Sequence, residues 1–176
     1  MKQKKLIILS DILGVIQSDW IKHYTNQLTP LLSVKFYDVR VLADIDLLIT
    51  AKELIHKQFV EGGIEKAIEN LIALEKEEVN ILAFSIGGTI AWKSTLRGLE
   101  SASLTLVSST RLRKETEKPN CKLNMYFGEK DKFKPNDEWF SKLNIEGTIF
   151  NNEGHEIYKE KSFAETICNT IKTQLQ

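Results

Sequence analysis

Residues 79–88, with the sequence VNILAFSIGG, join an apolar run of strand length directly to a serine and then to a helical pattern. Small residues, Ala83 and Gly87, stand two positions before and two positions after Ser85. A sharp strand-to-helix turn requires such neighbours, because strand and helix approach closely there and the serine adopts strained backbone angles. A serine at an ordinary helix N-cap is the alternative for this segment taken alone. The wider context favours a strand that carries a serine at its carboxyl end.

Short apolar runs alternate with longer amphipathic stretches along the whole chain. Most of the runs are continuously apolar, as expected of strands that are covered on both faces. The strands predicted from them lie at residues 6–9, 34–41, 79–84, 104–107, 123–127 and 148–150. The predicted helices lie at residues 20–32 (with Ser18 as N-cap), 64–72 (after a break at Gly62-Gly63), 86–96 (closed by Gly98), 136–143 and 162–175. This alternation predicts an α/β fold, a three-layer domain spanning residues 1–176, with a mostly parallel sheet of about six strands and helices on both faces.

Composition excludes several classes of function. The 176 residues include 24 Lys and Arg and 24 Asp and Glu, so no basic surplus favours nucleic acid as a partner. No apolar run approaches the roughly 18 residues of a membrane span. Asp11 ends the N-terminal apolar run too early for a signal peptide. The two cysteines, Cys121 and Cys168, do not have the spacing of metal ligands. We therefore expect a cytoplasmic protein with reduced thiols, no metal and no membrane partner.

Three residues able to take part in catalysis follow predicted strands. Open α/β sheets bind ligands beyond the carboxyl ends of their strands. Ser85 follows one strand, Asp131 follows the Gly128 turn after a later strand, and His155 lies in the loop after the last strand. A serine becomes nucleophilic when a histidine accepts its proton, and a carboxylate holds that histidine in the required tautomer.

Other residues keep alternatives open. Taken alone, the segment favours a turn aspartate at Asp131, and Glu129 and Asp137 are the other candidates for the acid. His23 and His56 fall within helical patterns, which favours positions at the surface or the core edge. The residues after the first strand, 10–14, contain too little glycine for a phosphate-binding loop, so no nucleotide or flavin cofactor is expected.

The order serine, aspartate, histidine resembles that of the α/β-hydrolase fold family over nearly the whole chain. The segment 83–87 is similar to its nucleophile elbow, with alanine in place of the first glycine. Gly128-Glu129-Lys130-Asp131 resembles the family's acid turn, and Gly154-His155 its histidine loop. The resemblance implies a catalytic triad of Ser85, Asp131 and His155.

The N-terminal loop resembles the family's oxyanion segment. Asp11-Ile12-Leu13-Gly14, with Trp20 six residues later, is similar to the His-Gly-x-Gly…Trp segment of small serine esterases. The resemblance implies that the backbone N–H groups of Leu13 and Ile86 form the oxyanion hole. Asp11 and Ile12 replace the family's His and Gly, so we expect a hole of different shape. A carboxylate beside a developing oxyanion must also point away from it or be hydrogen-bonded.

Two further departures concern the surroundings of the site. The chain begins where the family's third strand normally lies, so the usual leading hairpin is expected to be missing. The interval 107–123 has room only for a short loop, which predicts an open site without a cap. The aromatic candidates for pocket walls are Phe36, Trp92, Phe133 and Trp139.

The resulting hypothesis is a serine hydrolase that cleaves an ester or thioester through an acyl-enzyme. Its substrate would be a small molecule or an acyl ester held on a carrier protein, as in some small esterases that the sequence resembles. The alternative is a non-catalytic binding or scaffold domain that retained the fold. The basic residues Lys93, Arg97, Arg111, Arg113 and Lys114 are more typical of a solvated surface than of a docking site, and the oligomeric state stays open.

Overall fold

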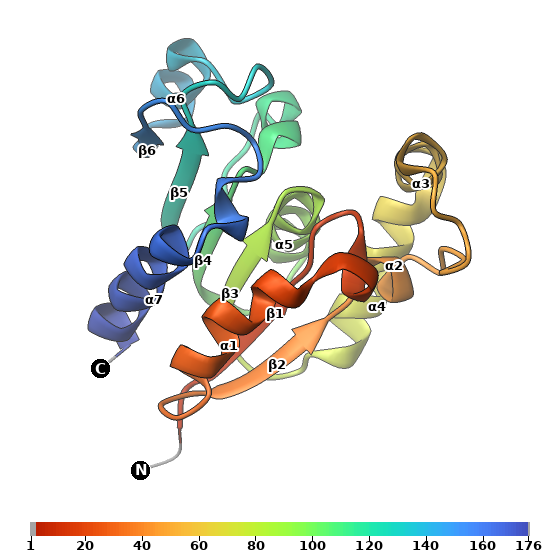
Figure 1. The fold of residues 1–176 in the computed structure, drawn as a ribbon, viewed down its shortest axis with the longest axis horizontal. Coiled ribbons are helices and arrows are strands. Elements are labelled where there is room, and N and C mark those ends of the chain that lie inside the picture. Colours follow the sequence, from red (N-terminus) through yellow and green to blue (C-terminus); the bar gives the residue numbers. More distant parts are fainter. Residues whose placement is uncertain (1–2, 176) are drawn as a thin grey trace.

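A six-stranded parallel sheet forms the centre of the molecule (Figure 1). The computed structural model describes residues 3–175, and of Gln17 the backbone alone. Every neighbouring pair of strands is parallel, in the order β2-β1-β3-β4-β5-β6. The strands are β1 (Lys5–Leu9), β2 (Ser33–Tyr37), β3 (Val79–Phe84), β4 (Ser101–Val107), β5 (Lys122–Gly128) and β6 (Gly147–Phe150). All six predicted strands are present.

Helices cover both faces of the sheet, which confirms the predicted three-layer α/β fold (Figure 1). Helices α1 (Lys22–Leu28) and α7 (Lys161–Leu175) pack on one face, and α4 (Ile64–Leu74) and α5 (Ile86–Leu96) on the other. Further elements are α2 (Val39–Leu42), α3 (Lys52–Gln58), α6 (Asp137–Leu143), the 3-10 turns Gly14–Gln17, Asp19–Ile21, Thr110–Lys114 and Ile157–Lys159, and the π-helical segment Phe59–Gly63. The connection from β4 to β5 holds only one 3-10 turn, as its short sequence predicts.

Strand β1 shows why the strands are continuously apolar. Successive side chains of a strand point to opposite faces. Ile7 and Leu9 belong to the hydrophobic core under α4 and α5, whereas Leu6 and Ile8 belong to the core under α1 and α7. A strand covered on both faces must therefore be apolar at every position, and all six residues of β3 are buried.

The predicted strand at 34–41 is too long. Strand β2 ends at Tyr37, and the next residues form the short helix α2. Asp38 is the N-cap of this helix, since its Oδ1 accepts a hydrogen bond of 2.8 Å from the Arg40 N–H. Its Oδ2 accepts another of 2.8 Å from the Val15 N–H. These bonds turn the chain despite the β-branched residues that follow.

The predicted helix at 20–32 is shorter than expected, and its proposed cap is wrong. A 3-10 turn precedes α1, which ends at Leu28. The Ser18 hydroxyl donates to the Val15 carbonyl at 2.9 Å and caps no helix N–H. The break at Gly62-Gly63 is confirmed, because Gly62 has a φ of 142° between α3 and α4. Helix α5 follows β3 after one residue, as the sequence predicts.

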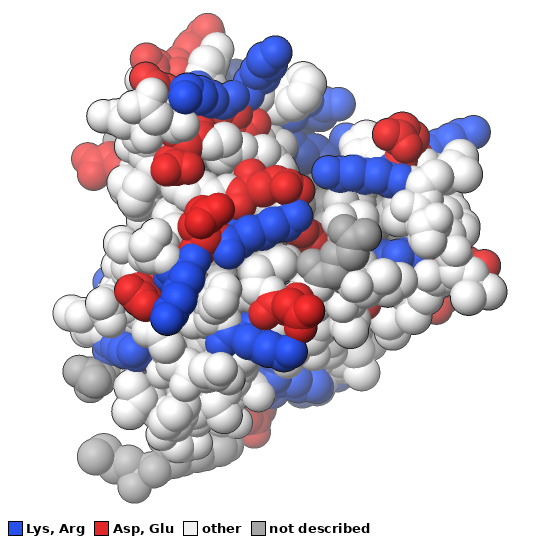
Figure 2. All heavy atoms as spheres, viewed as in Figure 1, with Lys and Arg blue, Asp and Glu red and all other residues white. Residues whose placement is uncertain are grey.

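The face drawn in Figure 2 carries acidic and basic side chains side by side, and neither sign forms a continuous patch there. None of the helices in residues 3–175 is both long and apolar enough to cross a membrane. Within the same described residues, no group of three or more His, Cys, Asp or Glu side chains is placed to hold a metal ion.

Candidate active site

The turn between β3 and α5 places Ser85 in a strained conformation. Ser85 has φ 50° and ψ −118°, a left-handed φ that residues with a side chain rarely adopt. A Cβ on Gly87 would lie 2.4 Å from the Ser10 carbonyl oxygen, and one on Gly88 would lie 1.8 Å from the Ser109 Oγ. The helix can begin directly after Ser85 only because these two positions carry no side chain. The prediction of a sharp turn that needs small residues is confirmed.

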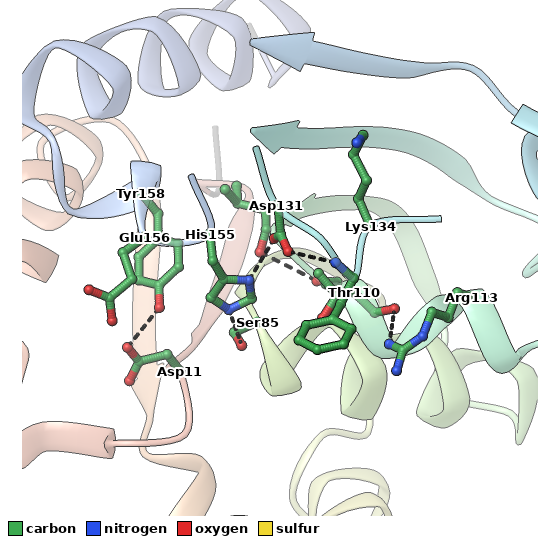
Figure 3. A network of polar contacts seen from close by, with 12 residues as sticks. Asp11, Ser85, Thr110, Arg113, Asp131, Lys134, His155, Glu156 and Tyr158 are labelled. Carbon is green, nitrogen blue, oxygen red and sulfur yellow. Dashed lines mark hydrogen bonds and ion pairs between the residues drawn. The ribbon is translucent and has the colours of Figure 1, made fainter. Parts of the chain in front are cut away.

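The three side chains predicted to act together are in contact (Figure 3). Ser85 Oγ lies 3.0 Å from His155 Nε2, and His155 Nδ1 lies 2.6 Å from Asp131 Oδ2. Asp131 is only 4% exposed, and its Oδ1 accepts a hydrogen bond of 3.2 Å from the Phe133 N–H. The geometry is a serine, a histidine that can accept its proton, and a buried carboxylate that orients the histidine.

Close contact between two loops sets the distance between Asp131 and His155. A Cβ on Gly128 would lie 2.5 Å from the carbonyl oxygens of Glu153 and Gly154, so this glycine lets the histidine loop pack on the end of β5. The Lys130 N–H also donates to the Glu153 carbonyl at 2.8 Å. The acid turn and the histidine loop therefore form one packed unit.

Neither of the other two carboxylates considered for the acid is bonded to His155 in the described structure. Glu129 Oε2 accepts a hydrogen bond of 2.8 Å from the Asn152 N–H. Asp137 lies in the first turn of α6. Of the three candidates, Asp131 is the one bonded to His155.

The two backbone N–H groups that the family resemblance implied as oxyanion donors differ in whether they are free. Ile86 is the first residue of α5, so its N–H has no acceptor within the helix and is free to bind an oxyanion. Leu13 does not fit, because its N–H donates to Asp11 Oδ1 at 3.0 Å. Ile12, one residue earlier, lines the same cavity as Ser85 and Ile86. Among the hydrogen bonds of the described chain, none engages the Ile12 N–H.

Asp11 stands where the family has histidine, and its carboxylate is hydrogen-bonded on both oxygens. Oδ1 accepts from the Leu13 N–H at 3.0 Å, and Oδ2 accepts from the Tyr158 hydroxyl at 3.1 Å. Asp11 is 2% exposed, and this burial raises the pKa of its carboxyl group despite the two hydrogen bonds. Burial also raises the pKa of Tyr158, which keeps its hydroxyl protonated as the donor. The expectation of a hydrogen-bonded carboxylate at this loop is met.

A cavity of about 560 Å³ opens over Ser85, a volume typical of a small-molecule site. Of the four aromatic candidates, Phe133 lines it. Trp92 and Trp139 pack against each other in the core, with ring centroids 6.1 Å apart, and Phe36 packs on the opposite face of the sheet. The lining residues are Asp11, Ile12, Lys52, His56, Ser85, Ile86, Thr110, Arg111, Arg113, Asp131, Phe133, His155, Glu156 and Tyr158.

Sequence reasoning did not assign several of these wall residues to the cavity. Lys52 and His56 come from α3, where their spacing of four residues puts them on one side of the helix. Arg111 and Arg113 come from the 3-10 turn after β4. The helical spacing was visible in the sequence, but the loop that carries α3 to the cavity was not.

The comparisons with known proteins agree with this architecture. No protein-family model and no curated protein match the sequence. Solved structures match nearly the whole chain: monoacylglycerol lipase from Paleococcus ferrophilus has a TM-score of 0.68 at 12% identity, covering 99% of this chain and 96% of the lipase. Alpha/beta hydrolase domain-containing protein 10 from mouse has a TM-score of 0.68 at 11% identity, covering 99% and 91%. A structure from a study of carboxylesterases of Nitrososphaera gargenis has a TM-score of 0.64 at 13% identity, covering 97% and 90%. The chain has the α/β-hydrolase fold.

Proposed function

We propose that this protein is a serine hydrolase that cleaves an ester or thioester through an acyl-enzyme. The observation that carries the proposal is the continuous line of contacts from Ser85 Oγ through His155 to the buried Asp131. The hydrolases, esterases and lipases among the structures of the same fold support the class of reaction.

In the first half of the reaction, Ser85 attacks the substrate carbonyl while His155 Nε2 takes the hydroxyl proton. The carboxylate of Asp131 stabilises the imidazolium that forms. When the tetrahedral intermediate collapses, His155 gives the proton to the leaving alcohol or thiol. In the second half, His155 activates a water molecule, which releases the acid from Ser85.

Two backbone donors would bind the oxyanion of each tetrahedral intermediate. We assign them to Ile86, at the N-terminus of α5, and to Ile12, in place of the Leu13 that the family resemblance implied. The Asp11–Leu13 hydrogen bond shapes this loop and uses the Leu13 N–H. One such donor is worth about 10²–10³ in rate.

Labelling with a fluorophosphonate, followed by mass mapping of the adduct, tests the proposal without requiring the natural substrate. We expect an adduct on Ser85 in the wild type and none in His155→Ala. His23→Ala is the matched control, because His23 lies in α1, is not among the residues that line the Ser85 cavity, and should leave labelling unchanged. No adduct on the folded wild type would instead favour the non-catalytic binding or scaffold domain.

Once Ser85 has been shown to react with the fluorophosphonate, hydrolysis assays on the unlabelled protein define the leaving group. The panel contains alkyl esters, the matching thioesters and the same acyl groups on a carrier protein. A carrier-bound substrate predicts that the carrier ester is cleaved with a higher kcat/KM than the free ester. Equal values would restrict the proposal to small molecules.

A further inference from the structure

The carboxylates that line the Ser85 cavity all have partners. Asp131 is bonded to His155, and Asp11 is bonded to Tyr158 and Leu13. Glu156 pairs with Lys159 at 2.8 Å and with Lys52 at 4.0 Å. The negative charge of the cavity is therefore already engaged, and so is Lys52.

The two arginines of the cavity have no such counter-charge. Within residues 3–175, Arg111 is half-buried and has no hydrogen bond or ion pair. Arg113 donates to the Thr110 carbonyl at 2.8 Å, and its guanidinium lies 5.4 Å from the centre of the Phe133 ring. Neither contact supplies a negative charge.

Nearby basic residues outside the cavity behave differently. Lys93 pairs with Glu115 at 3.5 Å, and Arg97 pairs with Glu65 at 2.6 Å. Of the basic group noted in the sequence, the two residues that face the Ser85 cavity are thus arginines without a carboxylate partner in the described chain.

Arg113 and the buried Asp11 carboxylate lie on opposite sides of the catalytic histidine (Figure 3). In Figure 3, Asp11 and Tyr158 lie on one side of the His155 ring, and Thr110 and Arg113 lie on the other. A guanidinium attracts anions and pairs with a carboxylate or phosphate through two parallel hydrogen bonds; Arg111 is half-buried and Arg113 is exposed. The 3-10 turn that carries both arginines begins three residues after β4, so a well-packed strand fixes its position.

We propose that the ester cleaved at Ser85 carries a second, anionic group, a carboxylate or a phosphate, which Arg111 binds with Arg113 beside it. The inference rests on the proposed hydrolase function and names its substrate class. Arg111 is a specificity-determining residue in this proposal, and the scissile carbonyl itself is handled by the groups around Ser85.

The test compares pairs of esters in which one member carries an anionic group and the other is neutral. Monoethyl adipate is paired with its neutral primary amide, and a butyryl ester of glycerol 3-phosphate is paired with the same ester of glycerol. We expect kcat/KM to be at least about tenfold higher for the anionic member of one pair. Preference in the first pair identifies a carboxylate, and preference in the second identifies a phosphate.

Two substitutions show whether Arg111 causes the preference. Arg111→Gln should remove it by lowering kcat/KM for the anionic ester to about the value of its neutral partner. Lys114→Gln is the control, since Lys114 lies on the same 3-10 turn but outside the cavity. Equal loss in both variants, or equal turnover of charged and neutral esters by the wild type, would overturn the inference and leave the hydrolase function standing.

Labelling separates failure of the inference from failure of the function. If Ser85 reacts with the fluorophosphonate but no ester is cleaved, the inference is tested by protecting Ser85 from labelling with adipate monoamide or with glycerol 3-phosphate. Protection that is stronger than with the uncharged diamide or with glycerol, and that Arg111→Gln abolishes, supports the inference, whereas equal or no protection by both anions refutes it. Absence of both labelling and hydrolysis refutes the proposed function and the inference together.

Discussion

The Tyr158 hydroxyl donates a hydrogen bond of 3.1 Å to Asp11 Oδ2 across 147 positions of sequence. The bond joins the loop after β1 to the 3-10 turn that follows His155, beside the cavity over Ser85. Together with the Leu13 N–H, it engages both oxygens of the buried Asp11 carboxylate. Tyr158 also packs against Trp20, with ring centroids 4.9 Å apart. Tyr158 therefore links the loop after β1 to the hydrophobic core.

Asp11→Asn should stabilise the protein at alkaline pH and have little effect at acidic pH. Because burial raises the pKa of Asp11 in the folded state, ionisation of this group costs stability. The cost is absent below the unfolded pKa of about 4 and develops as pH rises through the folded value. Denaturant unfolding at pH 4 and pH 8 measures it. A variant whose stability differs from the wild type equally at both pH values would contradict the prediction.

Ser85→Gly should raise the free energy of unfolding by about 1 kcal/mol and abolish hydrolysis. Glycine adopts the φ of 50° at Ser85 without strain, and the relief exceeds the extra backbone entropy that glycine loses on folding. Ser85→Ala keeps the strain, so it should abolish hydrolysis with an unchanged unfolding midpoint. Thermal unfolding of both variants gives the comparison. Equal midpoints in the glycine and alanine variants would argue against strain at this turn.

Asp131→Asn should lower kcat by about 10⁴, because an amide favours the wrong tautomer of His155. Glu129→Gln and Asp137→Asn are the matched controls and should retain nearly full activity, since neither carboxylate contacts His155 in the described structure. Steady-state kinetics on the best ester of the panel makes the measurement. A large loss in either control with a near-normal Asp131→Asn would move the acid to another residue.

Gly87→Ala should destabilise the protein by about 1–3 kcal/mol through overpacking. The new methyl group would lie 2.4 Å from the Ser10 carbonyl and 3.1 Å from the Leu9 Cβ, and neither backbone can move without disturbing β1. Ser94→Ala in the same helix is the control, because the buried Ser94 hydroxyl has no partner in the described structure and its loss should cost little. Denaturant unfolding measures the free energy of unfolding of the Gly87→Ala and Ser94→Ala variants. Similar small effects would show that helix α5 can shift away from β1.

Most helices and strands could be predicted from local patterns in the sequence. The bounds of β3 and α5 follow from an apolar run, a serine and flanking small residues, since a tight turn depends on residues adjacent in sequence. The strand predicted at residues 34–41 was too long, because its end depends on a residue distant in sequence. Asp38 caps α2 and accepts from Val15, a residue 23 positions away, and that tertiary bond overrides the strand preference of the β-branched residues.

The α/β class, and the order in which Ser85, Asp131 and His155 follow their strands, could be read from the sequence because parallel strands bring their carboxyl ends to one edge of the sheet. That Ile12 lines the cavity beside Ser85, while the Leu13 N–H is taken up by the Asp11 carboxylate, depends on the tertiary structure. It also decided that Arg111 lines that cavity without a counter-charge in the described chain, while Arg97 meets Glu65. Both outcomes depend on contacts between loops distant in sequence, whose positions no local spacing specifies.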